Sequence, residues 1–374
     1  MPWKEVTKVS LREEFIQLVL REDSNISALC QRYNISRKTG YKWIHRFLEE
    51  GEKGLHDRSR CPNVSPKKTS REIEERVLEV RDTHPAWGGR KIRRRLLNIG
   101  VTDVPSCSTI TMILRRNGRL SAEESLKHKA LTRFEAAQPN DLWQMDFKGW
   151  FQIKHGTCHP LTLLDDHSRF SLGIEACSNE RAQTVQGRLV SIFRRYGMPL
   201  AILCDNGAPF GASALSPYTT LGAWILRLGI RLIHGRPLHP QTQGKEERFH
   251  RTLKAEVLHS LKVEMLDIHA IQKRFDAWRD VYNFERPHEA LAMDLPIDRY
   301  SVSSREYPEV LPQIEYSPDD VVVKVRDGGR ICYFKKEFRV GKAFTGEYVA
   351  IRPTSYDNVR EVYYCNQVIK KLTL

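Results

Sequence analysis

Apolar residues recur every three or four positions through the first fifty residues, which predicts short amphipathic helices. Residues 11–21 place Leu11, Phe15, Leu18 and Val19 on one face of the first helix. A second helix is predicted from ISALCQRY, and Ser36 can cap a third, SRKTGYKWIHRFLEEG. The pattern therefore predicts a unit of three helices joined by tight turns.

The third of these helices has the two stripes that a recognition helix needs. Tyr41, Ile44 and Phe47 form the apolar stripe. The other stripe is basic and suited to contacts with bases and phosphates: Arg37, Lys38, Lys42, His45 and Arg46. We predict a helix-turn-helix DNA-binding domain over residues 10–51. The alternative is a plain three-helix bundle with a basic surface.

A second helical unit follows a stretch rich in Pro and Ser at residues 52–69. Helices are predicted over 70–82 and 88–100, and either Ser106 or Ser108 can cap a third. Two basic clusters on these helices are candidates for phosphate contacts: Lys91, Arg93, Arg94, Arg95, Arg115, Arg116 and Arg119. We predict a second DNA-binding domain, helix-turn-helix or winged, over residues 68–120, followed by a helical linker at 121–140.

From residue 141 the pattern changes to apolar runs of strand length. LWQMDFKGWFQI, PLTLLDDHSRF and SLGIEACS predict three strands joined by short turns. A helix with apolar Val185, Leu189, Ile192 and Phe193 follows, and then AILCDNG predicts a buried strand that ends at a carboxylate. This order of elements is typical of a ribonuclease H-like α/β sheet, which we expect over residues 141–300.

The carboxyl-terminal residues predict a separate all-β domain. Residues 301–317 have the Pro and Ser content of a linker. The runs VVVKV, RICYF, EFRVG, EYVAIRP and EVYYCNQVIKKL then predict about five short strands. We expect a small β-barrel over residues 318–374, and a multidomain chain in which helical units, an α/β core and this barrel follow in order.

Composition and charge narrow the class of protein. The 374 residues carry 60 Lys and Arg against 46 Asp and Glu, a net charge of +14, and 40% of them are hydrophobic. That hydrophobic content excludes a disordered chain, and eight cysteines without a CxxC pair favour reduced cytosolic thiols. No signal peptide is expected in the first twenty residues, and the longest uncharged run contains too many Gly and Pro residues to span a membrane.

The positive charge is concentrated toward the amino end. Residues 1–140 hold 28 Lys and Arg against 18 Asp and Glu, a charge of +10, and the remaining residues carry +4. A polyanion partner, most simply nucleic acid, explains this distribution. The alternative is a solvated basic surface that serves solubility.

Three acidic residues lie where an α/β sheet could bring them together. Asp146 lies inside the first predicted strand of the core, where a charge is costly without a cation, and Asp205 ends the fourth. Glu247 lies on a predicted helix that starts near Gly244. Mg²⁺ prefers carboxylate oxygens, and two ions about 3.5–4 Å apart can support displacement at phosphorus. Each acid alone is weak support, but together they suggest a metal site.

The ordered motifs WQMDF, LLDDHSRF, CDNGAPF, HPQTQGKEERFHRTLK and YNFERPHEAL resemble those of insertion-sequence DDE transposases with an integrase-type, retroviral integrase-like core. By this resemblance the three catalytic, metal-binding acids fall on Asp146, on Asp205, which is 59 positions further on, and on Glu247, a further 42 positions on. This chain has an acid, Glu246, at a position where the family usually has an apolar residue. Glu246 is therefore the alternative to Glu247 as the third acid. Asp165 and Asp166 are left out, because the family does not use this element for metal binding.

The resemblance also implies partners and a reaction. We expect two Mg²⁺ ions per active site, replaceable by Mn²⁺, a bacterial cytoplasmic location at the nucleoid, and a homodimer or larger assembly on double-stranded DNA. Further phosphate contacts are expected near the third acid from Lys245, Arg248, Arg251 and Lys254. The implied activity is cleavage at the inverted-repeat ends of the element and transfer of the 3′-hydroxyl into target DNA. The alternative is a catalytically silent, domesticated DNA-binding regulator.

Overall fold

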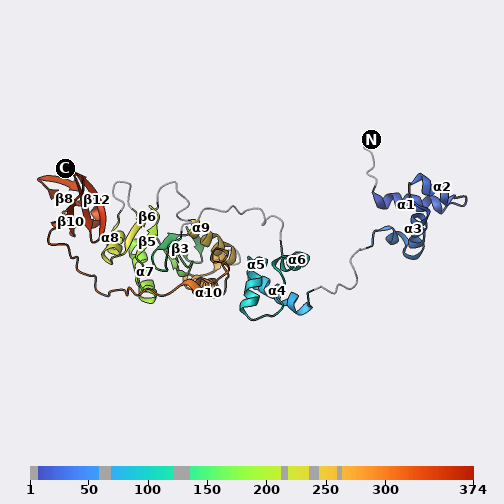
Figure 1. Cartoon of the computed structure of the whole chain (residues 1–374), viewed down its shortest axis with the longest axis horizontal. Coiled ribbons are helices and arrows are strands. Elements are labelled where there is room, and N and C mark those ends of the chain that lie inside the picture. Colours follow the sequence, from blue (N-terminus) through green and yellow to red (C-terminus); the bar gives the residue numbers. More distant parts are fainter. Residues whose placement is uncertain (1–6, 59–68, 121–134, 212–217, 236–243, 259–262) are drawn as a thin grey trace. The chain divides into compact units, whose positions relative to one another are not determined.

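The computed structural model describes residues 7–58, 69–120, 135–211, 218–235, 244–258 and 263–374 (Figure 1). It divides into two compact units, Met1–Lys68 and Thr69–Leu374, which are described separately below. Within the described ranges, none of the helices combines the length and apolar character that crossing a membrane requires.

The first unit has the predicted three helices: α1 (Lys8–Val19), α2 (Ile26–Arg32) and α3 (Arg37–Glu50), followed by the short turn η1 (Gly51–Leu55). Ser36 caps α3 by accepting a hydrogen bond from the Thr39 N–H, as expected from the sequence. A small core holds the helices together, and its buried members are Phe15, Ile16, Cys30, Trp43 and Leu55. Gly40 lies so close to Cys30 that a Cβ atom there would be only 2.5 Å from its sulfur, which explains the glycine within α3.

The second unit begins with another set of three helices, α4 (Arg71–Thr83), α5 (Gly89–Asn98) and α6 (Cys107–Arg116). Of the two possible caps for α6, Ser106 makes the capping bond, to the Thr109 N–H. Seven fully buried apolar side chains form the core of this domain: Val77, Trp87, Ile92, Leu96, Ile110, Ile113 and Leu114. The predicted helical linker lies largely in residues 121–134, outside the described ranges.

The sheet of the α/β core contains β1 (Trp143–Phe147), β2 (Phe151–Ile153), β3 (Gly156–Asp165), β4 (Ser171–Cys177), β5 (Ala201–Cys204) and β6 (Arg231–His234). Its order is β2-β3-β1-β5-β6, with β4 on the other side of β3. The segment predicted as one strand, LWQMDFKGWFQI, is divided by a bulge at residues 148–150, so that β1 and β2 pair in turn with β3. The order of elements otherwise matches the ribonuclease H-like prediction.

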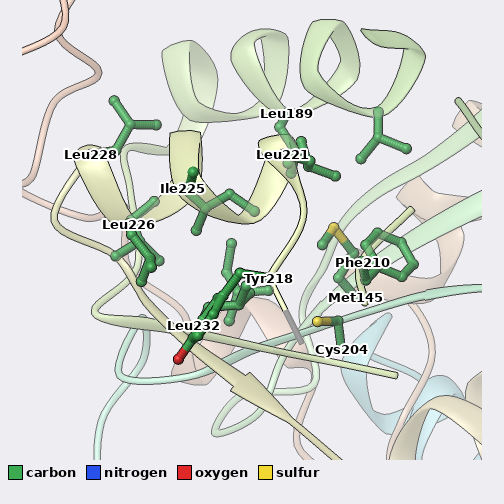
Figure 2. Packing of buried hydrophobic residues seen from close by; sticks show 14 of the residues in the cluster. Met145, Leu189, Cys204, Phe210, Tyr218, Leu221, Ile225, Leu226, Leu228 and Leu232 are labelled. Carbon is green, nitrogen blue, oxygen red and sulfur yellow. The ribbon is translucent and has the colours of Figure 1, made fainter. Parts of the chain in front are cut away.

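Helices cover both faces of this sheet. The side chains of Leu161 and Leu163 in β3 belong to the same cluster as those of α7 (Ala182–Tyr196) and α8 (Thr220–Arg227). Leu164 and Ile174 instead pack with α9 (Gly244–Leu253), its π-helical extension η4 (Lys254–Leu258) and α10 (Ile268–Phe284). Figure 2 shows the first cluster, with Leu189 of α7 beside Leu221 of α8. The remaining short helices of the core are η5 (Val263–Met265), η6 (Glu289–Leu291) and α11 (Pro296–Arg299).

The carboxyl-terminal domain is all-β, as predicted, but its details differ from the expected five-stranded barrel. Its described strands are β7 (Val321–Lys324), β8 (Arg330–Tyr333), β9 (Lys336–Arg339), β10 (Tyr348–Pro353), β11 (Val359–Tyr364) and β12 (Gln367–Thr373), with the turn η7 (Lys342–Phe344) before β10. They form a four-stranded sheet, β12-β11-β10-β7, and a separate hairpin, β8-β9. The run EVYYCNQVIKKL forms two strands because Cys365 takes a left-handed backbone conformation. Residues 301–317, all described, contain neither helix nor strand.

Candidate active site

Two of the three predicted acids lie at the ends of neighbouring strands. β1 and β5 run parallel, with Gln144 opposite Leu203. Extending this register by two residues places Asp146 opposite Asp205, which follows β5 directly. The carboxyl ends of parallel strands are where α/β sheets commonly form their sites, because the strand ends and the loops that follow them meet there. Thus the strand pairing brings together two carboxylates that are 59 residues apart in sequence.

The surroundings of Asp146 disfavour its ionised form. Burial has the largest effect on its pKa, the charge of Asp205 adds to it, and Glu180 and Glu247 contribute further, so that the pKa is raised to about 7. Burial also raises the pKa of Asp205, although a hydrogen bond from the Gly207 N–H (3.1 Å) opposes this. The site is therefore a partly desolvated group of negative charges.

The adjacent glutamates of α9 occupy different environments. Glu246 is only 1% exposed and lies on the packed face with Phe249 and Leu253, whereas Glu247 is exposed. Glu247 is close enough to Asp146 to raise the pKa of that carboxyl. The structure thus places Glu247 at the open side of the acidic group and Glu246 beneath it.

Glu246 belongs to a buried polar network below Asp146. The Thr162 hydroxyl lies 3.2 Å from Glu246 Oε2, 2.7 Å from His250 Nε2 and 3.0 Å from the carbonyl oxygen of Asp146. Burial raises the pKa of Glu246 well above its ordinary value and lowers that of His250 to about 4. The Thr162 hydroxyl can donate its proton to the Asp146 carbonyl or to Glu246 Oε2. The network therefore joins α9 to β3 and β1.

The donor set suits a hard divalent cation. Asp146, Asp205 and Glu247 offer carboxylate oxygens, and the effects that raise the pKa of Asp146 are the ones that a bound cation would relieve. Across the described ranges, no three His, Cys, Asp or Glu side chains converge into a ready-made metal site. Mg²⁺ often uses only one or two protein carboxylates and takes its remaining ligands from phosphate and water. The residues therefore fit Mg²⁺ that takes its remaining ligands from outside the protein.

A fourth carboxylate, Glu180, was not predicted from the sequence. It raises the pKa of both Asp146 and Asp205. His159 Nδ1 lies 2.8 Å from Glu180 Oε1, and His159 Nε2 lies 3.1 Å from the Thr157 hydroxyl. Glu180 reaches the site because β3 and β4 pair as a hairpin with His159 opposite Cys177. Its position in sequence, in a turn before α7, gave no signal of this proximity.

Asp165 and Asp166, which the sequence prediction leaves out of the site, accept several hydrogen bonds inside the fold. Both are fully buried. Asp165 accepts hydrogen bonds from the Asn140 N–H and from Ser168, while Asp166 accepts from the Ala136 N–H and the Gln144 amide. These bonds attach the segment before β1, which contains Ala136 and Asn140, to the end of β3.

Lys245, predicted to contact DNA, lies instead against Asp166. Its Nζ is 2.5 Å from Asp166 Oδ1, and burial lowers its pKa to about 8. Because a buried acid already holds the ammonium group, Lys245 fixes the start of α9 in this structure. The neighbouring predicted contacts Arg248, Arg251 and Lys254 have exposed side chains.

The amino-terminal candidates also differ in accessibility. Arg37, Lys38 and Lys42 of α3 are exposed, and Arg46 lies over the Trp43 ring. Arg115 and Arg116 of α6 are exposed as well, although Arg116 pairs with Glu74. On α5, Arg93 is half-buried, and burial together with Arg286 lowers the pKa of Lys91 to about 8. Arg94 and Arg95 form ion pairs with Asp294 (3.6 Å) and Glu285 (2.5 Å).

Family models match successive parts of the chain. A helix-turn-helix domain matches residues 11–62 and a homeodomain-like domain matches 39–114. Two integrase core domain models match 136–240 and 228–296, and the C-terminal domain of IS481 family transposases matches 320–374.

Curated relatives include the Gag-Pol polyproteins of avian reticuloendotheliosis virus (32% identical) and feline leukemia virus (30% identical). The matches cover 36% and 35% of this chain and only 11% and 7% of the polyproteins. Similar solved structures include the simian T-cell lymphotropic virus intasome with PP2A regulatory subunit B56 gamma (14% identity, TM-score 0.40, 79% of this chain and 95% of that one). Another is the HTLV-2 integrase catalytic core domain with magnesium (15% identity, TM-score 0.34, 45% of this chain and 100% of that one).

These family matches agree with the order of the elements along the chain. They extend from the first helical unit to the final β-domain. The chain therefore combines helix-turn-helix domains, an integrase core domain and a domain similar to the C-terminal domain of IS481 family transposases.

Proposed function

We propose that this protein is a DNA transposase. It would bind the inverted-repeat ends of its own insertion sequence through residues 10–120, cut the DNA at those ends, and join the freed 3′-hydroxyl to target DNA. The observation that supports this most is the pairing of β1 with β5, which brings Asp146 and Asp205 together in a chain with helix-turn-helix domains. Handling two ends together would require a homodimer or a larger assembly.

Asp146, Asp205 and Glu247 would hold two Mg²⁺ ions, or Mn²⁺ in their place, together with DNA phosphate oxygens. When bound, these ions lower the pKa of the attacking hydroxyl or water and stabilise the leaving oxygen. The hydrogen bond from the Gly207 N–H orients the Asp205 carboxylate, and the Thr162 network fixes the backbone of Asp146. Arg248, Arg251 and Lys254 are exposed beside Glu247 and would position the DNA backbone.

Two displacements at phosphorus follow in sequence. In the first, a water oxygen attacks the phosphodiester at the element end, the bond to the 3′-oxygen breaks, and that oxygen leaves as a 3′-hydroxyl after taking a proton. In the second, the 3′-hydroxyl loses its proton and attacks a target phosphodiester, whose own 3′-oxygen leaves and is protonated. Each step breaks one P–O bond and forms one, so no oxidant or reductant is needed.

The decisive assay uses labelled DNA that carries the inverted repeats flanking the gene. We expect nicking and joined products with Mg²⁺ or Mn²⁺, and neither product with EDTA or with scrambled ends. Sequence-specific binding without cleavage in either metal would instead favour the alternative, a catalytically silent regulator acting at the nucleoid.

The assignment of the third acid has a matched test in two neighbouring residues. Glu247→Gln should abolish strand transfer, because the exposed carboxylate is the proposed ligand. Glu246→Gln should retain most activity, since the amide oxygen can still accept the hydrogen bond from the Thr162 hydroxyl. Full activity of Glu247→Gln together with loss in Glu246→Gln would reverse the assignment.

A further inference from the structure

The outer edge of the catalytic sheet is covered by the carboxyl-terminal domain. Among the described strands, β6 ends the sheet, and only its inner edge pairs with a strand, β5. An edge strand normally leaves backbone N–H and C=O groups without partners. Here the Gln367 side chain, at the start of β12, accepts from the Leu232 N–H and donates to the Leu232 carbonyl, both at 3.0 Å. The Gln367 amide thus forms the two hydrogen bonds that a further strand would make to Leu232.

Tyr218 strengthens this contact from the segment before α8. Its hydroxyl accepts from the Gln367 amide at 2.9 Å and lies 3.5 Å from the Val368 carbonyl. Its ring lies 5.5 Å from Phe344 of the carboxyl-terminal domain and 6.0 Å from the His234 ring of β6. Tyr218 therefore contacts both domains from a buried position.

Apolar packing and one ion pair extend the same interface. A single buried cluster contains Leu228 and Leu232 from the core and Phe344, Tyr364 and Ile369 from the β-domain. Figure 2 shows the core side of this cluster, where Tyr218 and Leu232 lie close together. Arg227 at the end of α8 pairs with Glu347 at 3.3 Å. The β-domain is thus packed against the core and is more than a tethered tail.

β6, the strand that Gln367 contacts, forms hydrogen bonds with the turn that carries Asp205. Two residues after Leu232, His234 Nδ1 lies 3.2 Å from the carbonyl oxygen of Asp205. The Gly235 N–H donates to the Cys204 carbonyl at 3.0 Å, and the Asn206 amide donates to the Gly235 carbonyl at 2.7 Å. The end of β6 therefore makes hydrogen bonds to Asp205 itself and to the residues before and after it, Cys204 and Asn206.

We propose that Gln367 is a positioning residue for the active site, through which the carboxyl-terminal domain fixes β6 and thereby the Asp205 turn. This inference rests on the proposed role of Asp205 as a metal ligand. Loss of the Gln367 amide would loosen β6 and let the Asp205 carboxylate depart from the geometry that the metal needs. DNA binding would be little affected, because no proposed DNA contact lies at this interface.

The experiment compares full-length Gln367→Ala and Gln367→Glu with Thr373→Ala, an exposed control on the same strand. Gln367→Ala should lower Mn²⁺ affinity, measured by electron paramagnetic resonance, and strand-transfer kcat by about threefold to tenfold, as expected for losing two or three hydrogen bonds. The KM for DNA should change less than about twofold. Gln367→Glu should be intermediate, since its carboxylate can accept from the Leu232 N–H but cannot donate. Thr373→Ala should behave as wild type.

The outcomes separate this inference from the proposed function. A lower melting temperature with unchanged Mn²⁺ affinity and kcat, measured well below the transition, would show a purely structural role and overturn the inference. A rise in KM alone would indicate a DNA contact and also overturn it. If wild-type protein transfers no strands, the proposed function fails, while the Mn²⁺ titration still decides whether Gln367 positions the acids.

Discussion

At the scale of single residues, the burial that raises the pKa of Asp146 also makes its charged form costly for the folded chain. Asp146 lies half-buried with Asp205, Glu180 and Glu247 nearby, so its negative charge opposes folding until a cation is bound. Hydrophobic alternation predicted Asp146 as a charge inside a strand and Asp205 as the end of another. Glu180 could not be predicted in this way, because only the β3-β4 hairpin brings it to the site.

Asp146→Asn should stabilise the metal-free protein at alkaline pH. The pKa of Asp146 is raised from 3.8 to about 7, so the stability that its protonated form provides is present below about pH 4 and is lost as the pH rises through 7. Asparagine has no such dependence. At pH 8 we expect the core transition of the variant to melt a few degrees above wild type. The difference should vanish near pH 4, and Asp357→Asn, an exposed control, should show none. A variant less stable than wild type at pH 8 would contradict this account.

Glu180→Gln should shift the acid limb of the activity profile to lower pH. The Glu180 charge raises the pKa of Asp146 and Asp205, so its removal lets both acids ionise, and therefore bind metal, at lower pH. The measurement is the pH dependence of strand-transfer kcat in Mg²⁺. An unchanged acid limb, or one shifted to higher pH, would argue against electrostatic coupling between Glu180 and the two acids.

At the scale of elements, helix existence and caps followed from periodicity, whereas strand boundaries and basic helix faces needed the tertiary structure. The bulge at 148–150 could not be read from LWQMDFKGWFQI, because its apolar pattern continues through both strands. Similarly, the sequence of α5 shows a run of basic residues but gives no sign of the acids that face them. Glu285 and Asp294, almost 200 residues away, pair with Arg95 and Arg94 in the fold.

Arg93 and Arg95 offer a matched pair for testing how α5 meets DNA. Arg93→Gln should weaken DNA binding and reduce the slope of log affinity against log salt concentration by about 1, as expected for losing one phosphate contact. Arg95→Gln should change the slope less, because Glu285 holds this guanidinium at 2.5 Å. Fluorescence anisotropy across a salt series measures both. The reverse order would mean that the Arg95–Glu285 pair opens when DNA binds.

At the scale of the whole molecule, the positive charge is concentrated in the part of the chain that the helix-turn-helix models match, and the motif order predicted the order of the folds along the chain. Neither predicted that the final β-domain packs on the catalytic core. Its apolar residues alternate as in any small β-domain, so the sequence alone did not distinguish those facing its own interior from those facing α8 and β6. The linker composition of residues 301–317 suggested independence, yet Arg305 within it donates to the carbonyl oxygens of Leu228 and Gly229.

Deletion of residues 318–374 should therefore destabilise the core. The truncation uncovers Leu228 and Leu232 and leaves the outer edge of β6 without its Gln367 partner. We expect the core transition to fall by about 5 °C or more and the truncated chain to bind an apolar dye such as ANS. A truncated chain that melts with the full-length core and binds no dye would indicate that the β-domain is an independent tail.

Strand transfer by four variants in one Mg²⁺ assay tests most directly whether Asp146, Asp205 and Glu247 form the catalytic metal site. Asp146→Asn, Asp205→Asn and Glu247→Gln should each lower joining of inverted-repeat DNA by about 10³-fold or more, because metal-ion stabilisation is worth several kcal/mol. Each should still bind the DNA ends like wild type, and Glu246→Gln should remain active. The assignment would be contradicted if any of the first three variants joined DNA as efficiently as wild type. It would also be contradicted if the wild-type protein joined DNA in the presence of EDTA.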